Sequence, residues 1–425
     1  MNRRVVITGL GVLAPNGHGV ANFKSALMSG KSGIRFRPEL EAAKFGCRVA
    51  GVPEGYQELA GKYFKEEQLM SMNSSIKMAC IAAIDCWRDA GFEVPGEDSE
   101  TINWETGAII GTGIGGMDTI GEKVVPLTDS ARVRRMGSTI VEQVMMSGVS
   151  AKVSGLLALG NQVTTNSSAC STGAEAIVDA LYRIRNGLAD RMLAGGAEGA
   201  SPYTWSGFDS MRVLNRRHND DPTSASRPMS ASASGFIPGS GSGILMLESL
   251  ESAQKRNARI YAEVLGGFIN CGGHRLGGSM TAPNPAGVQR CIRGALEDAN
   301  IKAEEVDAIN GHLTATFADP YEIKNWSSAL ERSPDKMPLI NATKSLIGHA
   351  LGAAGGLEAV ACVLQVKDGF MHGSVNCDDL HNDLQPYSAS IVQETIAAPN
   401  LNILAKASFG FGDVNACIMF KKHEG

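Results

Sequence analysis

The sequence lacks the marks of a membrane or secreted protein. No apolar run approaches the roughly 20 residues that cross a bilayer, and the N-terminus has no hydrophobic signal segment. The nine cysteines show neither paired nor metal-ligand spacing, and an odd number excludes a complete set of intrachain disulfides. We therefore expect reduced thiols, a cytoplasmic location, no membrane insertion and no metal.

The sequence also has only a small excess of negative over positive charge. The 39 basic and 44 acidic residues give a net charge of −5, and no basic run with interleaved aromatic residues occurs. Nucleic-acid binding is therefore not expected. Low-complexity tracts are missing too, so the 50 glycines indicate tight turns and closely packed helices rather than disorder. The 425 residues, 43% of them hydrophobic, are enough for a large core.

The most informative segment spans residues 164–174. It predicts a short strand, a sharp turn and a helix whose first turn begins at Cys170. A thiol at that place faces unpaired backbone N–H groups and the positive end of the helix dipole, which favour the thiolate. A lone cysteine is more often a small buried hydrophobe, so other motifs must decide.

Three motifs downstream favour chemistry. Residues 310–316 follow an apolar run, which places His312 just beyond a buried strand. Residues 341–349 end in His349 and lead into a helix of small residues. Residues 407–412 form a glycine-rich turn between two strand-like runs. Each alone has an ordinary explanation, such as a core histidine or a hairpin, but the set in this order is specific.

With these four motifs the chain resembles the elongating β-ketoacyl-acyl-carrier-protein synthases of the thiolase-like superfamily, which have a Cys-His-His site. The resemblance extends from residues 5–11 to the last strand near 415–420. It implies an α/β fold of duplicated βαβαβαββ halves in five layers, α-β-α-β-α, with central helices between two sheets. We assign residues 1–250 to the half with the cysteine and 251–425 to the half with both histidines. The family also implies a homodimer built on the first half.

The sequence pattern predicts the positions of strands and helices. Helices are expected after Cys170, where apolar residues recur at helical spacing, and at 285–299 and 352–366. Strands are expected near 4–8, 106–110, 163–166, 192–197, 243–247, 261–266, 306–309, 401–407 and 416–420. Insertions that cap the active site are expected at 31–104, 116–160 and 201–236.

The resemblance implies a decarboxylative condensation. Cys170 would carry the acyl chain as a thioester, with the backbone N–H groups of Cys170 and Phe409 stabilising the oxyanion. Neutral His312 and His349 would donate to the malonyl thioester carbonyl as carbon dioxide leaves. Lys344 would organise the site through a charge pair with Glu358. No cofactor is expected, because acyl carrier protein brings both substrates on its phosphopantetheine.

Further residues match substrate-binding positions of the family. Thr314 and Thr316, with Thr281 as a third candidate, would bind the phosphopantetheine arm. Ile114 and Phe208 would line or close the acyl pocket. Core packing and turn formation explain these five residues nearly as well.

Three departures from the family pattern affect the entrance of the site. Leu313 replaces a usual glycine after His312, and residues 317–322 form a shortened loop. Asp413 replaces a glycine of the gating loop, which consists of the glycine-rich turn 407–412 and Asp413 itself. A bulky Leu313 lacks the conformational freedom of glycine, so we expect a rebuilt loop.

Two functions other than fatty-acid elongation stay open. A specialised polyketide or aryl-polyene synthase shares the chemistry, and a non-catalytic chain-length partner subunit shares the fold but lacks the nucleophile. The presence of Cys170 argues against the second.

An acidic carrier protein would dock on a basic patch in the insertions that cap the active site, for which we name Lys62, Lys65, Arg216 and Arg217.

Overall fold

The computed structural model describes residues 3–424. Among these residues, no helix is both long and apolar enough to cross a membrane. In the first half of the chain the main strands are β1 (Val5–Ala14), β5 (Thr106–Gly111), β6 (Val163–Thr164), β7 (Arg191–Glu198) and β8 (Gly241–Ser249). Those of the second half are β9 (Ala262–Cys271), β10 (Ala308–Asn310), β11 (Leu339–Asn341), β14 (Ile403–Gly410) and β15 (Val414–Lys422).

The two sets of strands share one topology. The orders are β1-β8-β7-β5-β6 and β9-β15-β14-β10-β11. In both sets the first two pairings are antiparallel and the last two are parallel. A short β1–β9 ladder joins the sets into one continuous sheet. This repeat confirms the predicted duplication, and the boundary after residue 250 stays a prediction.

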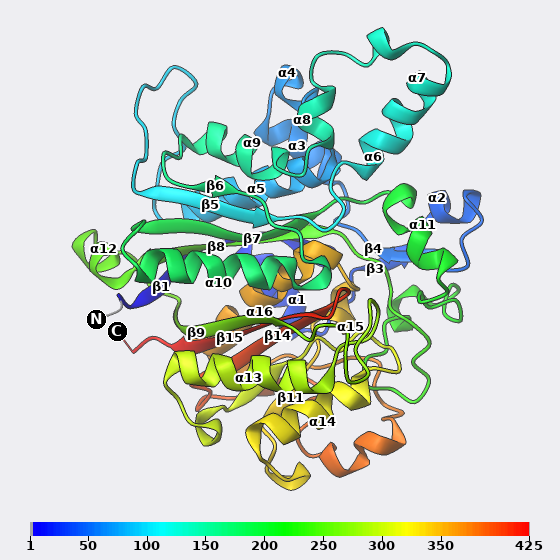
Figure 1. The fold of residues 1–425 in the computed structure, drawn as a ribbon, viewed down its shortest axis with the longest axis vertical. Helices are drawn as coiled ribbons and strands as arrows, with labels where there is room; N and C mark the ends of the chain where they lie inside the picture. Colours follow the sequence, from blue (N-terminus) through cyan, green and yellow to red (C-terminus); the bar gives the residue numbers. More distant parts are fainter. Residues whose placement is uncertain (1–2, 425) are drawn as a thin grey trace.

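Five layers result (Figure 1). Helices α5 (Ser74–Asp89) and α9 (Gly148–Leu157) cover the outer face of the first set of strands. Helices α10 (Thr172–Arg185) and α16 (Ala354–Asp368) lie between the two sets, and α13 (Pro285–Ala299) and α14 (Asp319–Leu330) cover the far side. A side chain on Gly355 would place its first carbon 2.3 Å from the backbone nitrogen of Ala174. Small residues therefore allow the central helices to pack closely.

Some sequence-based predictions need correction. Cys170 lies in a 3-10 turn (Ala169–Ser171) just before α10, rather than in its first turn. Strand β11 was not predicted, because its three residues are too short for a clear alternation. The predicted insertion 31–104 is also partly wrong, since α5 inside it packs on β1, β7 and β8 as a core layer.

Candidate active site

Cys170 lies at a turn with a strained backbone. The preceding Ala169 has a φ of 48°, in the left-handed region that alanine seldom adopts. The Thr172 hydroxyl holds the turn: it accepts the Ser168 N–H at 2.8 Å and donates to the Ala169 carbonyl at 2.7 Å. Two hydrogen bonds at the N-terminus of α10 thus offset the backbone strain next to Cys170.

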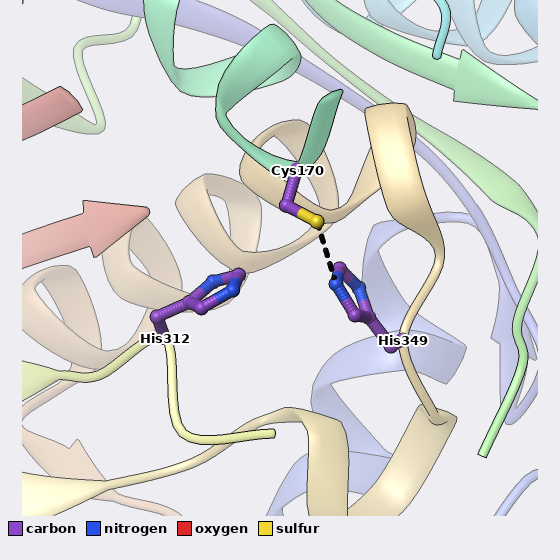
Figure 2. Close-up of side chains that lie close together, drawn as sticks. All are labelled: Cys170, His312 and His349. Carbon is purple, nitrogen blue, oxygen red and sulfur yellow. Dashed lines mark hydrogen bonds between the residues drawn. The ribbon is translucent and has the colours of Figure 1, made fainter. Parts of the chain in front are cut away.

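His349 faces the sulfur directly. Its Nε2 lies 3.0 Å from Sγ of Cys170, a contact drawn as a dashed line in Figure 2. Its Nδ1 accepts the N–H of Leu351 at 3.2 Å. A neutral ring whose Nδ1 accepts a hydrogen bond carries its proton on Nε2. His349 therefore presents an N–H donor to whatever lies beside the sulfur.

His312 has the same arrangement. It follows β10 by two residues, and its Nδ1 is 3.4 Å from the Nζ of Lys344, which can only donate. The proton of His312 is therefore also on Nε2. Sγ of Cys170 and one ring nitrogen from each histidine lie within 4.8 Å of one another. The site thus gathers one nucleophile and two N–H donors around a small space (Figure 2).

The hydrogen bonds at Nδ1 decide what this cluster can bind. A histidine that ligates a metal through Nε2 normally donates its other N–H to an acceptor. In His312 and His349 the other nitrogen accepts instead, so Nε2 keeps its proton and offers no lone pair. The trio suits a developing oxygen anion rather than a metal ion.

Burial sets the protonation of the site. Burial, with the charge of Lys344 adding to it, lowers the pKa of both His312 and His349 well below the usual value, so both rings are neutral at pH 7. Burial also raises the pKa of the Cys170 thiol to about 11, although Lys344 acts in the opposite direction. Desolvation is the largest of these effects, so it opposes the thiolate that we expected the turn to favour.

Glu358 lies between two lysines. Lys344 forms an ion pair with its Oε1, and Lys406 lies 2.7 Å from its Oε2. All three side chains are buried. The sequence had suggested the pairing of Lys344 with Glu358, whereas Lys406 was missed because it stands in the apolar run of a predicted strand.

The glycine-rich loop brings a different residue to the sulfur than expected. The backbone amide of Phe411 is the one in this loop that lowers the pKa of the Cys170 thiol. Phe409, the predicted donor, is paired with Asn415 in the β14–β15 ladder. Gly410 lies between them, and a side chain there would place its first carbon 3.1 Å from the Cys170 nitrogen.

Other predicted residues lie around this centre. The hydroxyls of Thr314 and Thr316 are 3.0 Å apart in the loop after His312. Thr281 is exposed in a separate loop. Ile114 and Phe208 pack at the edge of one apolar cluster.

Two aromatic neighbours connect this cluster with the site. The ring centroid of Phe208 is 6.2 Å from that of Phe411. Phe236, which sequence reasoning missed, contacts both Phe208 and the His349 ring, at centroid distances of 5.6 and 5.2 Å. An aromatic wall therefore leads from the glycine-rich loop to His349.

Two buried acids support the loops of the site, and neither was predicted. Glu322 accepts the backbone N–H groups of His312 at 2.6 Å and Leu313 at 2.8 Å. Burial raises the pKa of Glu322 to about 7. Glu198 accepts the backbone N–H groups of Gly113 at 2.8 Å and Gly352 at 2.9 Å. The only sequence signal was an acid next to an apolar run.

Leu313 and Asp413, the two residues that replace glycines of the family pattern, both have positive φ angles. Leu313 is buried, with a φ of 21°, and packs in the core cluster of the second half. Asp413 has a φ of 61°, and its carboxylate accepts the N–H groups of His274 at 3.1 Å and Asn284 at 2.7 Å. The gating loop is thereby tied to residues 272–284.

Comparisons with known proteins agree with this geometry. Residues 2–253 match the model of the β-ketoacyl synthase N-terminal domain, and residues 261–378 match that of the C-terminal domain. The chain is 36% identical to the chloroplastic 3-oxoacyl-acyl-carrier-protein synthase I of Arabidopsis thaliana, over 98% of this chain and 86% of the relative. It is 35% identical to 3-oxoacyl-acyl-carrier-protein synthase 2 of Vibrio harveyi, over 99% of both.

Solved structures give the same result. The ishigamide ketosynthase/chain length factor superposes with a TM-score of 0.89 at 29% identity and covers 100% of both chains. The type II polyketide ketosynthase of the AntDE:AntF complex, solved with its acyl carrier protein, superposes with a TM-score of 0.86 at 28% identity over 100% of both chains. The chain therefore belongs to the β-ketoacyl synthase family.

Proposed function

We propose that this protein is a β-ketoacyl-acyl-carrier-protein synthase that elongates fatty-acyl chains. It condenses an acyl chain held on Cys170 with malonyl-acyl carrier protein. One observation carries the proposal: the Cys170 sulfur and a ring nitrogen from each of two neutral histidines lie within 4.8 Å of one another, and Nε2 of His349 is 3.0 Å from the sulfur. The relatives that are named 3-oxoacyl-acyl-carrier-protein synthases support it.

In the first half-reaction the Cys170 sulfur attacks the thioester carbonyl of the acyl carrier protein. The new C–S bond forms, and the carbonyl oxygen becomes an anion that the N–H groups of Cys170 and Phe411 stabilise. The bond to the carrier sulfur then breaks, and the proton lost by Cys170 ends on the carrier thiol. The acyl chain occupies the pocket that Ile114 and Phe208 border.

In the second half-reaction the malonyl thioester carbonyl accepts the Nε2–H groups of His312 and His349. The bond to the carboxylate carbon breaks, carbon dioxide leaves, and the electron pair forms an enolate that the two donors stabilise. The enolate carbon attacks the Cys170 thioester and the C–S bond breaks. The product is β-ketoacyl-acyl carrier protein, and the thiol of Cys170 is restored by a proton from solvent.

Lys344 and Glu358 act behind the histidines. Lys344 donates to Nδ1 of His312, which keeps the proton of that ring on Nε2. Glu358 balances its charge, since an unpaired buried lysine would lose much of its protonation. No resident cofactor takes part in this scheme.

The carrier protein is the proposed partner, with Thr314, Thr316 and Thr281 binding its phosphopantetheine arm. Of the basic residues named for docking, Lys65 is 2.9 Å from Glu97 and Arg216 is 3.3 Å from Asp209, so these charges are partly neutralised. Lys62 and Arg217 are exposed and form no ion pair within the described residues. Charge reversal of Lys62 or Arg217 should raise the KM for carrier-bound substrate more at low salt than at high salt.

We further propose a homodimer formed by the first half of the chain. Strand β6 (Val163–Thr164) ends the sheet with an unpaired edge among residues 3–424, and such an edge can pair with a second copy. Light scattering at several concentrations measures the dimer directly.

The nine cysteines are free thiols, which supports a reducing compartment such as the cytoplasm.

A specialised ketosynthase is the second candidate. It is favoured by the two structural neighbours described above and by the rebuilt residues Leu313 and Asp413 at the entrance. Intact mass spectrometry decides between the two functions. The protein is incubated with carrier proteins bearing saturated, unsaturated or polyketide-like chains, followed by malonyl-acyl carrier protein. Preferred acylation by saturated chains supports fatty-acid elongation, and no adduct with any chain contradicts both.

A further inference from the structure

Lys406 is a second buried lysine of the active site that the proposed mechanism does not use. It lies on β14, and its Nζ is 2.7 Å from Oε2 of Glu358, a charge contact rather than a well-directed hydrogen bond. The same Nζ donates to the Ser408 hydroxyl at 3.0 Å and to the Ala407 carbonyl. Lys406 thus contacts both the acid behind the histidines and the end of the strand that leads to the glycine-rich loop.

The charges of this group do not balance within the triad. Lys344 and Lys406 share the single carboxylate of Glu358, and all three are buried. One lysine would be enough to neutralise the acid, and each additional buried charge is costly. A second lysine is retained at such a cost most readily where its charge has a use.

The surroundings of Lys406 show where that charge acts. On the face of the sheet that carries the Lys406 side chain, α16 contributes Glu358 and Cys362. On β15 the residue paired with Lys406 is Ile418, and Cys417 packs on the opposite face of the sheet. The groups on the side of the site are Lys344, His312 and His349. Beyond them lies Glu322, whose carboxylate interacts with Lys344. After burial and Lys344, the charge of Lys406 is a further cause that lowers the pKa of both His312 and His349.

The strand contact reaches the nucleophile as well. The Ser408 carbonyl accepts the hydroxyl of Ser171, the residue after Cys170, at 3.1 Å. That hydroxyl also lies 2.9 Å from the Val414 carbonyl, at the start of the next strand. Lys406 therefore braces the strand end that is attached to the Cys170 turn.

We propose that Lys406 is a positioning residue for condensation: it fixes Glu358 and the end of β14, and its charge favours the enolate that forms beside His312 and His349. The inference rests on the proposed function only for the identity of the anion. The enolate gains one negative charge when the malonyl C–C bond breaks and carbon dioxide departs. A buried cation behind the histidines stabilises that charge in a site of low dielectric constant.

The test compares Lys406→Gln and Lys406→Met with wild type. Lys421→Gln is the matched control, because Lys421 lies on β15, opposite Ile403 at the far end of β14. Histidine protonation is followed by NMR of ¹³C-labelled rings between pH 4 and 8, which needs no activity. We expect His312 and His349 to protonate about tenfold more readily without the Lys406 charge. The control should titrate like wild type.

Kinetics supplies the second readout. With Lys406→Gln, we expect kcat for malonyl-acyl carrier protein decarboxylation to fall about tenfold with little change in KM, and its acid limb to move to higher pH. Unshifted histidine titrations in both variants would overturn the inference, as would wild-type histidines that titrate near the ordinary value. If wild type shows no decarboxylation, the proposed function fails, while the NMR titrations still decide the role of Lys406.

Discussion

His349 donates toward the sulfur of Cys170 from a ring nitrogen 3.0 Å away, and the N–H of Leu351 at its other nitrogen fixes this tautomer. The histidine nearest to the nucleophile is therefore a donor and not a resting base. The two half-reactions therefore depend on different groups: the sulfur carries the acyl chain, while the histidines stabilise the enolate anion. Substitutions of Cys170 and of the histidines should affect acyl transfer and decarboxylation independently.

The Cys170→Ala variant should lose acyl transfer and keep decarboxylation. It removes the only group that forms the thioester, while the Nε2–H groups of His312 and His349 stay in place. We expect no acyl adduct by intact mass spectrometry, and continued conversion of malonyl- to acetyl-acyl carrier protein. Condensation by this variant at the wild-type rate would show that Cys170 is not the nucleophile.

The His312→Ala variant should show the opposite pattern. Loss of one donor to a developing oxyanion costs about 10²- to 10³-fold in rate, so decarboxylation should fall by that factor. Acylation of Cys170 should change by no more than a few-fold, because His349 keeps its contact with the sulfur. His423→Ala, near the end of the last strand, is the control. Equal loss of both half-reactions would argue that His312 only supports the fold.

The framework could be predicted from the sequence because its strands are continuous apolar runs and its central helix has apolar residues at helical spacing. Ile177, Leu181 and Ile184 are all buried as that spacing indicates. The charges of the site could not be predicted in the same way. Glu358 and Lys406 are 48 positions apart, and only the packing of α16 against β14 brings them together.

The oxyanion donor shows a second limit of sequence reasoning. Phe409 and Phe411 stand two residues apart in the same glycine-rich motif, and the pattern does not say where the strand ends. The structure continues β14 to Gly410, which leaves the amide of Phe411 free to reach the sulfur. The burial that raises the pKa of the Cys170 thiol could not be predicted for a related reason, because desolvation depends on the layers packed around the turn.

The pH dependence of Cys170 alkylation follows from its raised pKa. With the thiol pKa raised to about 11, the reactive thiolate is scarce at neutral pH, and the alkylation rate should climb until about that pH. Lys344 favours the thiolate, so Lys344→Met should slow alkylation at each pH below the midpoint. Iodoacetamide labelling of the Cys170 peptide, followed by mass spectrometry, measures both. A midpoint at or below 9 would contradict the desolvation argument.

Asp413 should hold the gating loop to residues 272–284. Its carboxylate accepts the N–H groups of His274 and Asn284, and its own carbonyl accepts the Gly272 N–H at 2.9 Å. Replacement by glycine removes the left-handed strain of Asp413, worth roughly 1 kcal/mol. It also removes two hydrogen bonds to a charged group, worth about 1.5–3 kcal/mol each. The net effect of Asp413→Gly should therefore be release of the loop.

Hydrogen exchange measures that release. In Asp413→Gly, amides of residues 273–284 should exchange at least about tenfold faster, as expected when local opening becomes easier by more than 1.4 kcal/mol. Asp413→Asn is the matched variant, since its amide keeps one acceptor oxygen and should give an intermediate rate. Amides of α10, which do not contact Asp413, should not change. Unaltered exchange in residues 273–284 would mean that the other contacts of this segment, such as the Gly412 N–H on the Met280 carbonyl at 2.8 Å, are sufficient to hold it.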